Sequence, residues 1–412
     1  MTNTKKVVIF TVCVLLNACG PEKTETSFGD DVAFLSNHVE TIVLGAESGP
    51  ARVAVVPAWQ GRVMTSADAG DSGMSYGWLN RPLIEKGFAP ENEREGLERH
   101  IHVFGGEDRF WIGPEGGQFS WYFPEAAAFE FENWKVPAFI DTDPWTVTHQ
   151  DDSSVRMEFR ASLKNWSGQL FSLGIEREVA LLDQEAITSA LGIQPGANVD
   201  YVAYESRNTL SNIGEEAWDT QSGLPSIWIL GMLKHGARTT VVIPYRKDAP
   251  DASAAIVKDD YFGKVPADRL IVDQDTGVIY FSADGTYRSK IGINQTRSFG
   301  VAGSWDAVND VLTIVQYNTP DTPMNYVNSS WELQQEPFQG DAINSYNDGP
   351  VDGGQLGPFY ELETSSPALA LAPNESYLHM QRTIHLTGGR EQLDLIVVHV
   401  FGVNLDAIEN AL

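Results

Sequence analysis

Residues 105–122 read Gly-Gly-Glu-Asp-Arg-Phe-Trp-Ile-Gly-Pro-Glu-Gly-Gly-Gln-Phe-Ser-Trp-Tyr. Neither a plain strand nor a flexible linker needs this mixture of glycines, aromatic rings, acids and one arginine. Glycine lets the backbone turn with positive φ or approach a ligand closely. Aromatic faces beside charged hydrogen-bonding groups are typical of sites that bind sugars. We therefore expect a ligand to bind beside this stretch.

The chain on both sides of this stretch reads as strands and loops. Apolar runs at 52–57 and 62–66 predict a hairpin, and residues 67–98 have the glycine, proline and polar residues of a long loop. After Val136, short runs of alternating polarity are separated by turn residues, which is typical of antiparallel strands. We expect such strands at 145–149, 154–163, 170–181, 186–193, 201–210, 226–233, 238–244, 270–273, 278–282, 297–302, 311–317, 359–364 and 377–386.

Helical spacing appears only near the C-terminus. Leu393, Ile396, Val397 and Val400 recur at i, i+3, i+4 and i+7 after a pair of glycines, which predicts a short helix. No repeat of fixed period and no obvious linker divides the chain before it. We therefore expect a single all-β, mainly antiparallel domain over residues 30–412, built from two large sheets and ending in a short helix.

The N-terminus carries a processing signal. Two lysines precede an apolar run at 7–16, and residues 16–19 read Leu-Asn-Ala-Cys, with a small residue before the cysteine. This pattern resembles a bacterial lipobox, which implies a lipoprotein signal peptide at 1–18, a lipid on Cys19 and a tether at 19–29. The glycine after the cysteine implies sorting to the outer membrane, on its periplasmic face. The alternative is an ordinary secretory signal with a chance cysteine.

The charge of the chain restricts its partners. The formal net charge is −28, from 28 basic and 56 acidic residues. So acidic a surface repels nucleic acid and anionic lipid, and it disfavours polyanions unless a local basic patch intervenes. We expect a carbohydrate as partner, no nucleic acid, and membrane contact through the lipid alone. A saline habitat would also explain the charge. Both cysteines, at 13 and 19, belong to the N-terminal signal, so the mature chain has no disulfide and no thiol nucleophile.

Three segments, in this order, resemble the galactose mutarotase-like superfamily, which includes the aldose 1-epimerases. Residues 60–63, Gln-Gly-Arg-Val, are similar to its opening Gly-Gly-Arg-Ile segment. Residues 105–115 are similar to a Gly-Gly-x-x-x-Trp-x-x-Pro-Glu segment of its divergent bacterial branches. Residues 359–364 and 368–377 are similar to the signature in which a glutamate precedes a Leu-x-Pro-Gly-Glu turn and a final strand. The resemblance spans almost the whole mature chain and implies a β-supersandwich.

The same resemblance implies an acid–base site. Mutarotases use a glutamate as general base and a histidine as general acid, because opening a hemiacetal removes one proton and donates another. Glu363 lies closest to the base position, and Glu361 shares its face of the strand because side chains alternate. The family histidine follows an Asn-rich strand, but the corresponding region of this chain carries Trp228 and no histidine. This departure counts against ordinary epimerase activity.

Other polar residues near the glycine-rich stretch are candidates for the missing acid and for binding. His100 and His102 would supply the acid, or two metal ligands together with Glu107 or Asp108; the alternative is a pair of structural histidines. The guanidinium of Arg109 suits sugar hydroxyls and uronate carboxylates, and Trp111 would stack on a pyranose or pack in the core. We expect no metal and no cofactor. The expected catalytic residues are Glu363, Glu361, His102 and His100, and the expected substrate-binding residues are Arg109, Trp111, Glu107, Trp228 and Tyr360.

Two functions fit these residues. The first is a lipid-anchored periplasmic enzyme of the aldose 1-epimerase-like type, which uses carboxylate and histidine acid–base chemistry as a sugar epimerase or mutarotase, a glycoside hydrolase or a polysaccharide lyase. The second is a glycan-binding lipoprotein without catalysis. The paired carboxylates, the histidines and the arginine favour catalysis, whereas Trp228 in place of a histidine favours binding. The sequence leaves both open.

Overall fold

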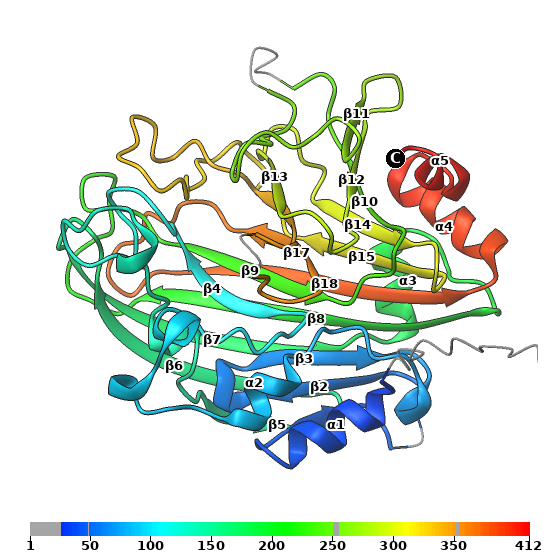
Figure 1. Cartoon of the computed structure of the whole chain (residues 1–412), viewed down its shortest axis with the longest axis horizontal. Coiled ribbons are helices and arrows are strands. Elements are labelled where there is room, and N and C mark those ends of the chain that lie inside the picture. The colour runs from blue at the N-terminus through cyan, green and yellow to red at the C-terminus, as the bar shows by residue number, and fades with distance from the viewer. Residues whose placement is uncertain (1–25, 48, 250–254, 352–353) are drawn as a thin grey trace, which may run out of the picture.

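The protein is described by a computed structural model that covers residues 26–47, 49–249, 255–351 and 354–412 (Figure 1). The predicted signal peptide and Cys19 lie outside the described residues. Helix α1 (Phe28–Ser36) begins after Ser27, whose side chain accepts a hydrogen bond from the Asp30 amide, and Phe28 is buried. Packed structure therefore begins inside the predicted tether.

The described residues form three antiparallel sheets. The ten-stranded sheet has the order β11-β12-β10-β14-β15-β18-β8-β7-β6-β5, and the five-stranded sheet has the order β13-β16-β17-β9-β4. The ten-stranded sheet contains β5 (Thr146–Gln150), β6 (Ser154–Lys164), β7 (Leu170–Leu181), β8 (Val199–Asn212), β10 (Thr239–Pro244), β11 (Leu270–Asp273), β12 (Val278–Ser282), β14 (Val301–Asp306), β15 (Val311–Tyr317) and β18 (Ser376–Gly388). The five-stranded sheet contains β4 (Arg109–Gly113), β9 (Ser226–Leu233), β13 (Ser289–Ile293), β16 (Ile343–Asn347) and β17 (Tyr360–Ser365). The small sheet contains β1 (Ile42–Leu44), β2 (Arg52–Val56) and β3 (Arg62–Ala67).

The two larger sheets pack face to face. The Tyr360 hydroxyl of β17 lies 2.7 Å from the Ser304 hydroxyl of β14, and Thr364 Oγ1 lies 2.8 Å from His379 Nε2 of β18. Because side chains alternate along a strand, Glu361 between these two residues points to the opposite face. The five-stranded sheet therefore has one face inside the sandwich and one face, the outer face, beneath covering loops.

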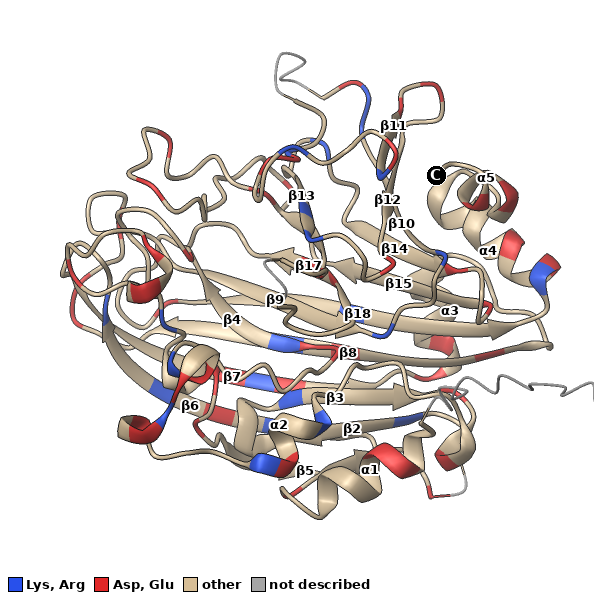
Figure 2. Ribbon diagram, viewed as in Figure 1, with Lys and Arg blue, Asp and Glu red and all other residues tan. Residues whose placement is uncertain are grey.

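Helices cover the far side of the ten-stranded sheet. They are α3 (Gln184–Leu191), α4 (Arg390–Phe401) and α5 (Leu405–Glu409), and their apolar side chains share one core with β10, β12, β14, β15 and β18. A further short helix, α2 (Arg81–Lys86), lies within the predicted long loop. None of the helices in the described part of the chain is long and apolar enough to cross a membrane. Figure 2 shows acidic residues spread over the loops and helices, with a few charged residues inside strands.

The structure confirms the prediction of an all-β, mainly antiparallel fold with a short C-terminal helix. The predicted bounds of 170–181, 226–233, 270–273, 278–282 and 311–317 agree with β7, β9, β11, β12 and β15.

The expected strand at 186–193 is wrong, because this segment forms α3. The Asp183 side chain accepts a hydrogen bond from the Ala186 amide at 2.8 Å, and Gly192 ends the helix with φ of 70°.

Candidate functional site

The outer face of the five-stranded sheet collects charged side chains from three strands. Directly paired residues of antiparallel strands have side chains on the same face. Arg109 of β4 pairs with Leu230 of β9, which in turn pairs with Glu363 of β17. On the other side of β17, the register of β13 and β16 brings Lys290 to the same face as Glu361.

Two buried ion pairs form on this face. Arg109 Nη2 lies 2.5 Å from Glu361 Oε1, and Lys290 Nζ lies 2.8 Å from Glu363 Oε2. The indole Nε1 of Trp228 also donates to Glu363 Oε2, at 2.9 Å. Arg109, Glu361 and Glu363 are buried, so these charges are paired where water is largely excluded. Burial of such pairs carries a desolvation cost, and it is weak evidence for a purely stabilising role.

The protonation of the site is shifted toward neutral carboxyl groups. Burial raises the pKa of Glu361 to about 7, with Arg109 opposing and Glu363 adding to the shift. Burial also raises the pKa of Glu115 to about 7, with Lys290 opposing and Glu363 adding. Burial lowers the pKa of Lys290, but Glu363, Glu115 and Glu361 together outweigh it and leave that pKa above its ordinary value. Near neutral pH, Glu361 and Glu115 can therefore donate a proton, whereas the carboxyl group of Glu363 is paired with Lys290.

Several polar atoms on this face have no hydrogen-bond partner. They are Glu363 Oε1, Arg109 Nε and Trp111 Nε1, all buried and without a partner among the described residues. Folded proteins leave few buried polar atoms unpaired, and those that remain call for an explanation. One acceptor and two donors at one site match the hydrogen-bonding needs of a hydroxyl-rich ligand.

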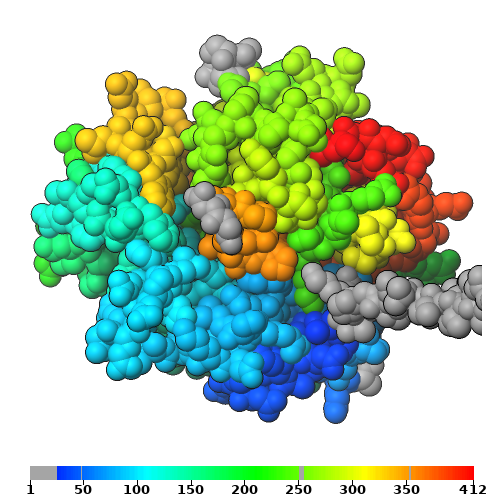
Figure 3. Space-filling view, viewed as in Figure 1, coloured from blue at the N-terminus to red at the C-terminus, as the bar shows by residue number. Residues whose placement is uncertain are grey.

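Aromatic rings and two loops enclose the site. The Trp111 and Trp228 rings meet edge to face, with centroids 5.7 Å apart, and the Arg109 guanidinium lies 5.4 Å from the Trp111 ring. The Glu115 amide donates to Ser329 Oγ at 3.1 Å, which joins the segment after β4 to the loop between β15 and β16. In Figure 3, cyan, gold and orange segments, far apart in the chain, lie side by side on one face of the molecule.

The structure brings five of the predicted site residues together. Arg109, Trp111, Trp228, Glu361 and Glu363 all lie on the outer face, and the two glutamates share one face of β17 as expected. Their roles in catalysis or binding stay predictions.

Four other predicted residues have their contacts elsewhere. His102 Nδ1 lies 2.9 Å from Asp141, and His100 Nδ1 lies 2.6 Å from the Trp134 carbonyl oxygen. Glu107 Oε2 lies 3.1 Å from His385 Nε2 and Tyr360 contacts Ser304, so both belong to the interior of the sandwich. Within the described residues, no hydrogen bond joins these four side chains to Glu361 or Glu363.

Sequence reasoning missed Lys290 and Glu115. Lys290 lies in the short strand β13, which reads Ser-Lys-Ile-Gly-Ile and was not predicted. Glu115 belongs to the distinctive stretch and follows its proline, so its place in the motif was a usable signal. In the described ranges, no group of three or more His, Cys, Asp or Glu side chains is placed to hold a metal ion.

Comparison with known proteins gives a family model and distant structures. Residues 26–412 match the sequence model described as "Family of unknown function (DUF6786)". No curated protein matches the chain.

Several solved structures are similar to this chain at low identity. A protein of Synechocystis sp. is 14% identical over 85% of this chain and 96% of that chain, with a TM-score of 0.48. A galactose mutarotase-like protein of Lactobacillus casei is 9% identical over 84% and 100%, with a TM-score of 0.47. A putative aldose 1-epimerase of Escherichia coli is 11% identical over 85% and 99%, with a TM-score of 0.43. Two of these three proteins are described as galactose mutarotase-like or as a putative aldose 1-epimerase, which is the superfamily that the three sequence segments resemble.

Proposed function

Because the chain belongs to this family of unknown function, its activity must be inferred from its own site, and we propose that it converts a sugar by proton transfer between carboxyl groups. The proposed reaction is of the aldose 1-epimerase type. A base removes the proton of the anomeric hydroxyl, the bond between the anomeric carbon and the ring oxygen breaks, and an acid protonates that oxygen. Closure on the other face of the carbonyl gives the second anomer.

Glu363 is the base in this proposal. The main support is that its two carboxylate oxygens differ in their hydrogen bonds. Oε2 is held by Lys290 Nζ at 2.8 Å and by Trp228 Nε1 at 2.9 Å. Oε1 is buried and has no hydrogen-bond partner among the described residues. A carboxylate fixed by one oxygen and free at the other is oriented to accept a proton from a bound hydroxyl.

Glu115 is the acid. Its pKa of about 7 leaves it partly protonated near neutral pH, which suits a proton donor. Its charge interacts with Lys290 and Glu363, so it belongs to the same electrostatic cluster as the base. A histidine was expected in this role, but His100 contacts the Trp134 carbonyl oxygen and His102 contacts Asp141.

Binding of the sugar falls to Arg109 and the tryptophans. Arg109 is oriented by Glu361 at 2.5 Å and keeps Nε as an unused donor, and Trp111 keeps its indole N–H. Aromatic rings pack against the apolar faces of a pyranose, while buried donors meet its hydroxyls. A neutral sugar also avoids repulsion by a chain of net charge −28.

One observation favours the second candidate, a glycan-binding protein without turnover. Trp228 lies in the region where the epimerase pattern has its histidine, and its N–H is used by Glu363. An indole does not carry a proton between water and substrate, so a site of this kind would hold a sugar without converting it.

The test is anomer exchange, followed by proton NMR on a panel of reducing sugars. We expect the wild type to speed exchange of at least one sugar, and Glu363→Gln and Glu115→Gln each to lower the rate by about 10²-fold or more. The control is Glu158→Gln, which changes an exposed glutamate of β6. Binding without exchange in the wild type would favour the glycan-binding protein, and neither binding nor exchange would rule out both.

We also propose that Cys19 carries a lipid that anchors the protein to the outer membrane on its periplasmic side. The support is the sequence at 7–19, where an apolar run ends in Leu-Asn-Ala-Cys. Metabolic labelling with palmitate should mark the wild type and not Cys19→Ser. Label in the variant, or recovery of the wild type without label in the soluble fraction, would contradict the proposal.

A further inference from the structure

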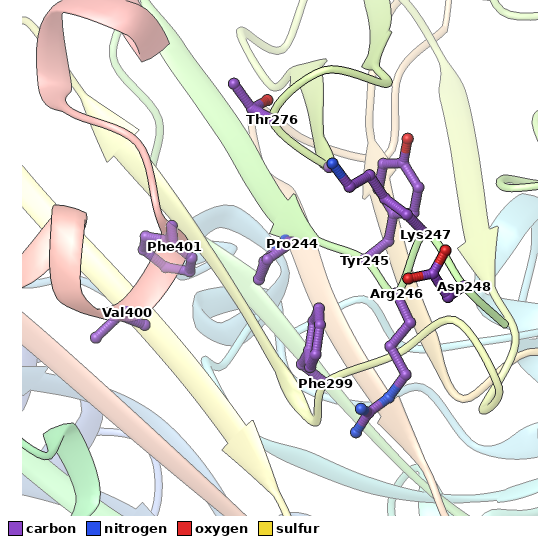
Figure 4. Close-up of a pocket in the computed structure, with 10 residues that line it drawn as sticks. Pro244, Tyr245, Arg246, Lys247, Asp248, Thr276, Phe299, Val400 and Phe401 are labelled. Atoms are coloured by element: carbon purple, nitrogen blue, oxygen red, sulfur yellow. The ribbon is translucent and has the colours of Figure 1, made fainter.

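A cleft that shares no lining residue with the outer-face site opens beside the end of α4 (Figure 4). It lies where the end of β10, the turn between β11 and β12, and the end of α4 come together. Its volume is about 610 Å³, within the range of small-molecule sites. The lining residues include Pro244, Arg246, Lys247, Thr276, Phe299 and Phe401.

The cleft has an apolar side and a charged side. Pro244, Phe299 and Phe401 supply the apolar side, and Figure 4 shows Phe299 between Phe401 and the charged residues. Phe299 is 47% exposed, although aromatic rings of this size are usually covered. Arg246, Lys247 and the carboxylate of Asp248 stand on the charged side, where the cations outnumber the acid two to one. A ligand that fills this cleft would meet an aromatic face and cations together.

The two cations are held in place without an ion pair to a described residue. Arg246 Nε donates to the Ser298 carbonyl oxygen at 3.2 Å, and its guanidinium lies 4.4 Å from the centre of the Phe299 ring. Lys247 Nζ donates to the Asp275 carbonyl oxygen at 3.1 Å. Both side chains are exposed, in a chain with twice as many acids as bases. They outnumber the one carboxylate of the lining, Asp248, and so form the local basic patch that an anionic ligand of so acidic a protein requires.

We propose that this cleft binds an acidic saccharide, that is, a sugar ring that bears a carboxylate. The guanidinium of Arg246 pairs with the carboxylate, because its planar donors match the two oxygens. The ring of the sugar packs on Phe299, and the hydroxyl of Thr276 and the ammonium of Lys247 meet its oxygens. The choice of an anion rests on the cleft alone, whereas the choice of a saccharide rests on the proposed function.

The probe is digalacturonate, titrated by calorimetry into the wild-type protein, with the neutral disaccharide galactobiose as comparison. We expect digalacturonate to bind and to weaken as salt is added, because the attraction is between partly exposed charges. The double variant R246Q/K247Q should raise Kd by tenfold or more. The matched control is R160Q/K164Q, which removes the same charge from exposed positions of β6, with five strands of the sheet between β6 and β10.

Each contrary outcome overturns a defined part of the proposal. Equal binding of galactobiose, equal loss in both double variants, or no binding of digalacturonate would overturn the anion site. Equal binding of benzoate would overturn the choice of a saccharide. Glu363→Gln separates this cleft from the proposed active site: retained binding in that variant supports the cleft, and lost binding places the probe on the outer face. Absence of anomer exchange leaves this titration unaffected. Unchanged thermal unfolding of each variant shows that it is folded.

Discussion

Two groups of buried charges lie on opposite sides of the same sheet, and they differ in how completely they are paired. Asp108 and Arg109 are adjacent in the chain. Asp108 points into the sandwich and pairs with Arg177 at 2.5 Å, whereas Arg109 points to the outer face and pairs with Glu361 at 2.5 Å. Neighbouring residues of one motif therefore contribute to two sites with different properties.

The Asp108–Arg177 pair of the inner group uses nearly all of its hydrogen-bonding capacity, although Glu107 Oε1 and His379 Nδ1 on the same side have no partner among the described residues. Arg177 donates to the Gly61 carbonyl oxygen at 2.9 Å, to Asn208 Oδ1 at 2.5 Å and to Asp108 Oδ1 at 2.5 Å. Asp108 Oδ2 accepts a bond from Ser206 at 2.8 Å. The outer group leaves three buried atoms without a partner in the described chain. A saturated network fixes the packing of the sheets, while an unsaturated one retains capacity for a ligand.

Arg177→Met should produce the largest effect on stability. The variant keeps an unbranched apolar side chain but leaves Asp108 buried without its cation, which costs about 3–5 kcal/mol of unfolding free energy. Urea denaturation measures this change. The control is Arg156→Met, which breaks a surface pair between Arg156, 41% exposed, and Glu178, and should cost below about 1 kcal/mol. Equal losses in the two variants would remove the distinction between structural and surface pairs.

Glu363→Gln should reverse this pattern, with a large effect on turnover and a smaller one on stability. The rate of anomer exchange should fall by about 10²–10⁴-fold, because the variant lacks a base. Lys290 remains attracted by Glu115 and Glu361, so the loss in unfolding free energy should stay below that of Arg177→Met. Both quantities can be measured on one preparation. A variant as unstable as Arg177→Met, with an unchanged rate, would assign the outer group to stability.

Much of the fold could be predicted from the sequence, because long strands show their pattern locally. The 12 residues of β7 alternate between the core and solvent, and β9 is a continuous apolar run between turn residues. Segment 186–193 was predicted as a strand because its apolar residues also fit that pattern. It forms a helix, which Asp183 caps at the N-terminus and Gly192 at the C-terminus. Strands β13 and β16 were missed because they are short and polar and are defined by their neighbours in the sheet.

The site could be predicted only in part, for a related reason. Glu361, Glu363 and Arg109 belong to recognisable motifs, so their types and order were informative. The side of the sheet that each neighbour faces depends on register, and Glu107 was placed with Arg109 although the two lie on opposite sides. Lys290 joins Glu363 across 73 positions of the chain, and no local pattern predicts that pair.

Glu115 should make the stability of the outer group depend on pH. Its pKa is about 7 in the folded protein and near 4.5 when exposed, so the folded state holds a proton that the unfolded state has released between these values. Stability from this group is present below pH 4.5 and is lost as the pH rises through 7. Glu115→Gln should therefore gain about 3 kcal/mol relative to the wild type between pH 4 and pH 8. Urea denaturation at both values, with Glu158→Gln as control, tests this; a constant difference would exclude the shift.

Trp331→Phe should have the smallest effect and should act on the chemistry of the outer face alone. Trp331 lies in the loop between β15 and β16 and is 36% exposed. Its ring stacks with that of Trp134, with centroids 5.8 Å apart. Burial raises the pKa of Glu115, and the Trp331 side chain opposes this shift through an indole N–H that phenylalanine lacks. The pKa of the acid should therefore rise further in the variant, by less than about one unit.

The rate of anomer exchange should then persist to higher pH in Trp331→Phe, because the acid must be protonated to react. The matched control is Trp166→Phe, which also removes an indole N–H, one that donates to the Ala127 carbonyl oxygen at 2.7 Å. If the pH profiles of both variants equal that of the wild type, Glu115 is not the acid. The unpaired Arg109 Nε and Trp111 Nε1 beside Glu363 would then serve binding alone. If only the pH profile of Trp331→Phe shifts, a partly exposed residue tunes the pKa of the acid on the outer face. The hydrogen bonds around Arg177 join buried groups to one another and leave no place for such an effect.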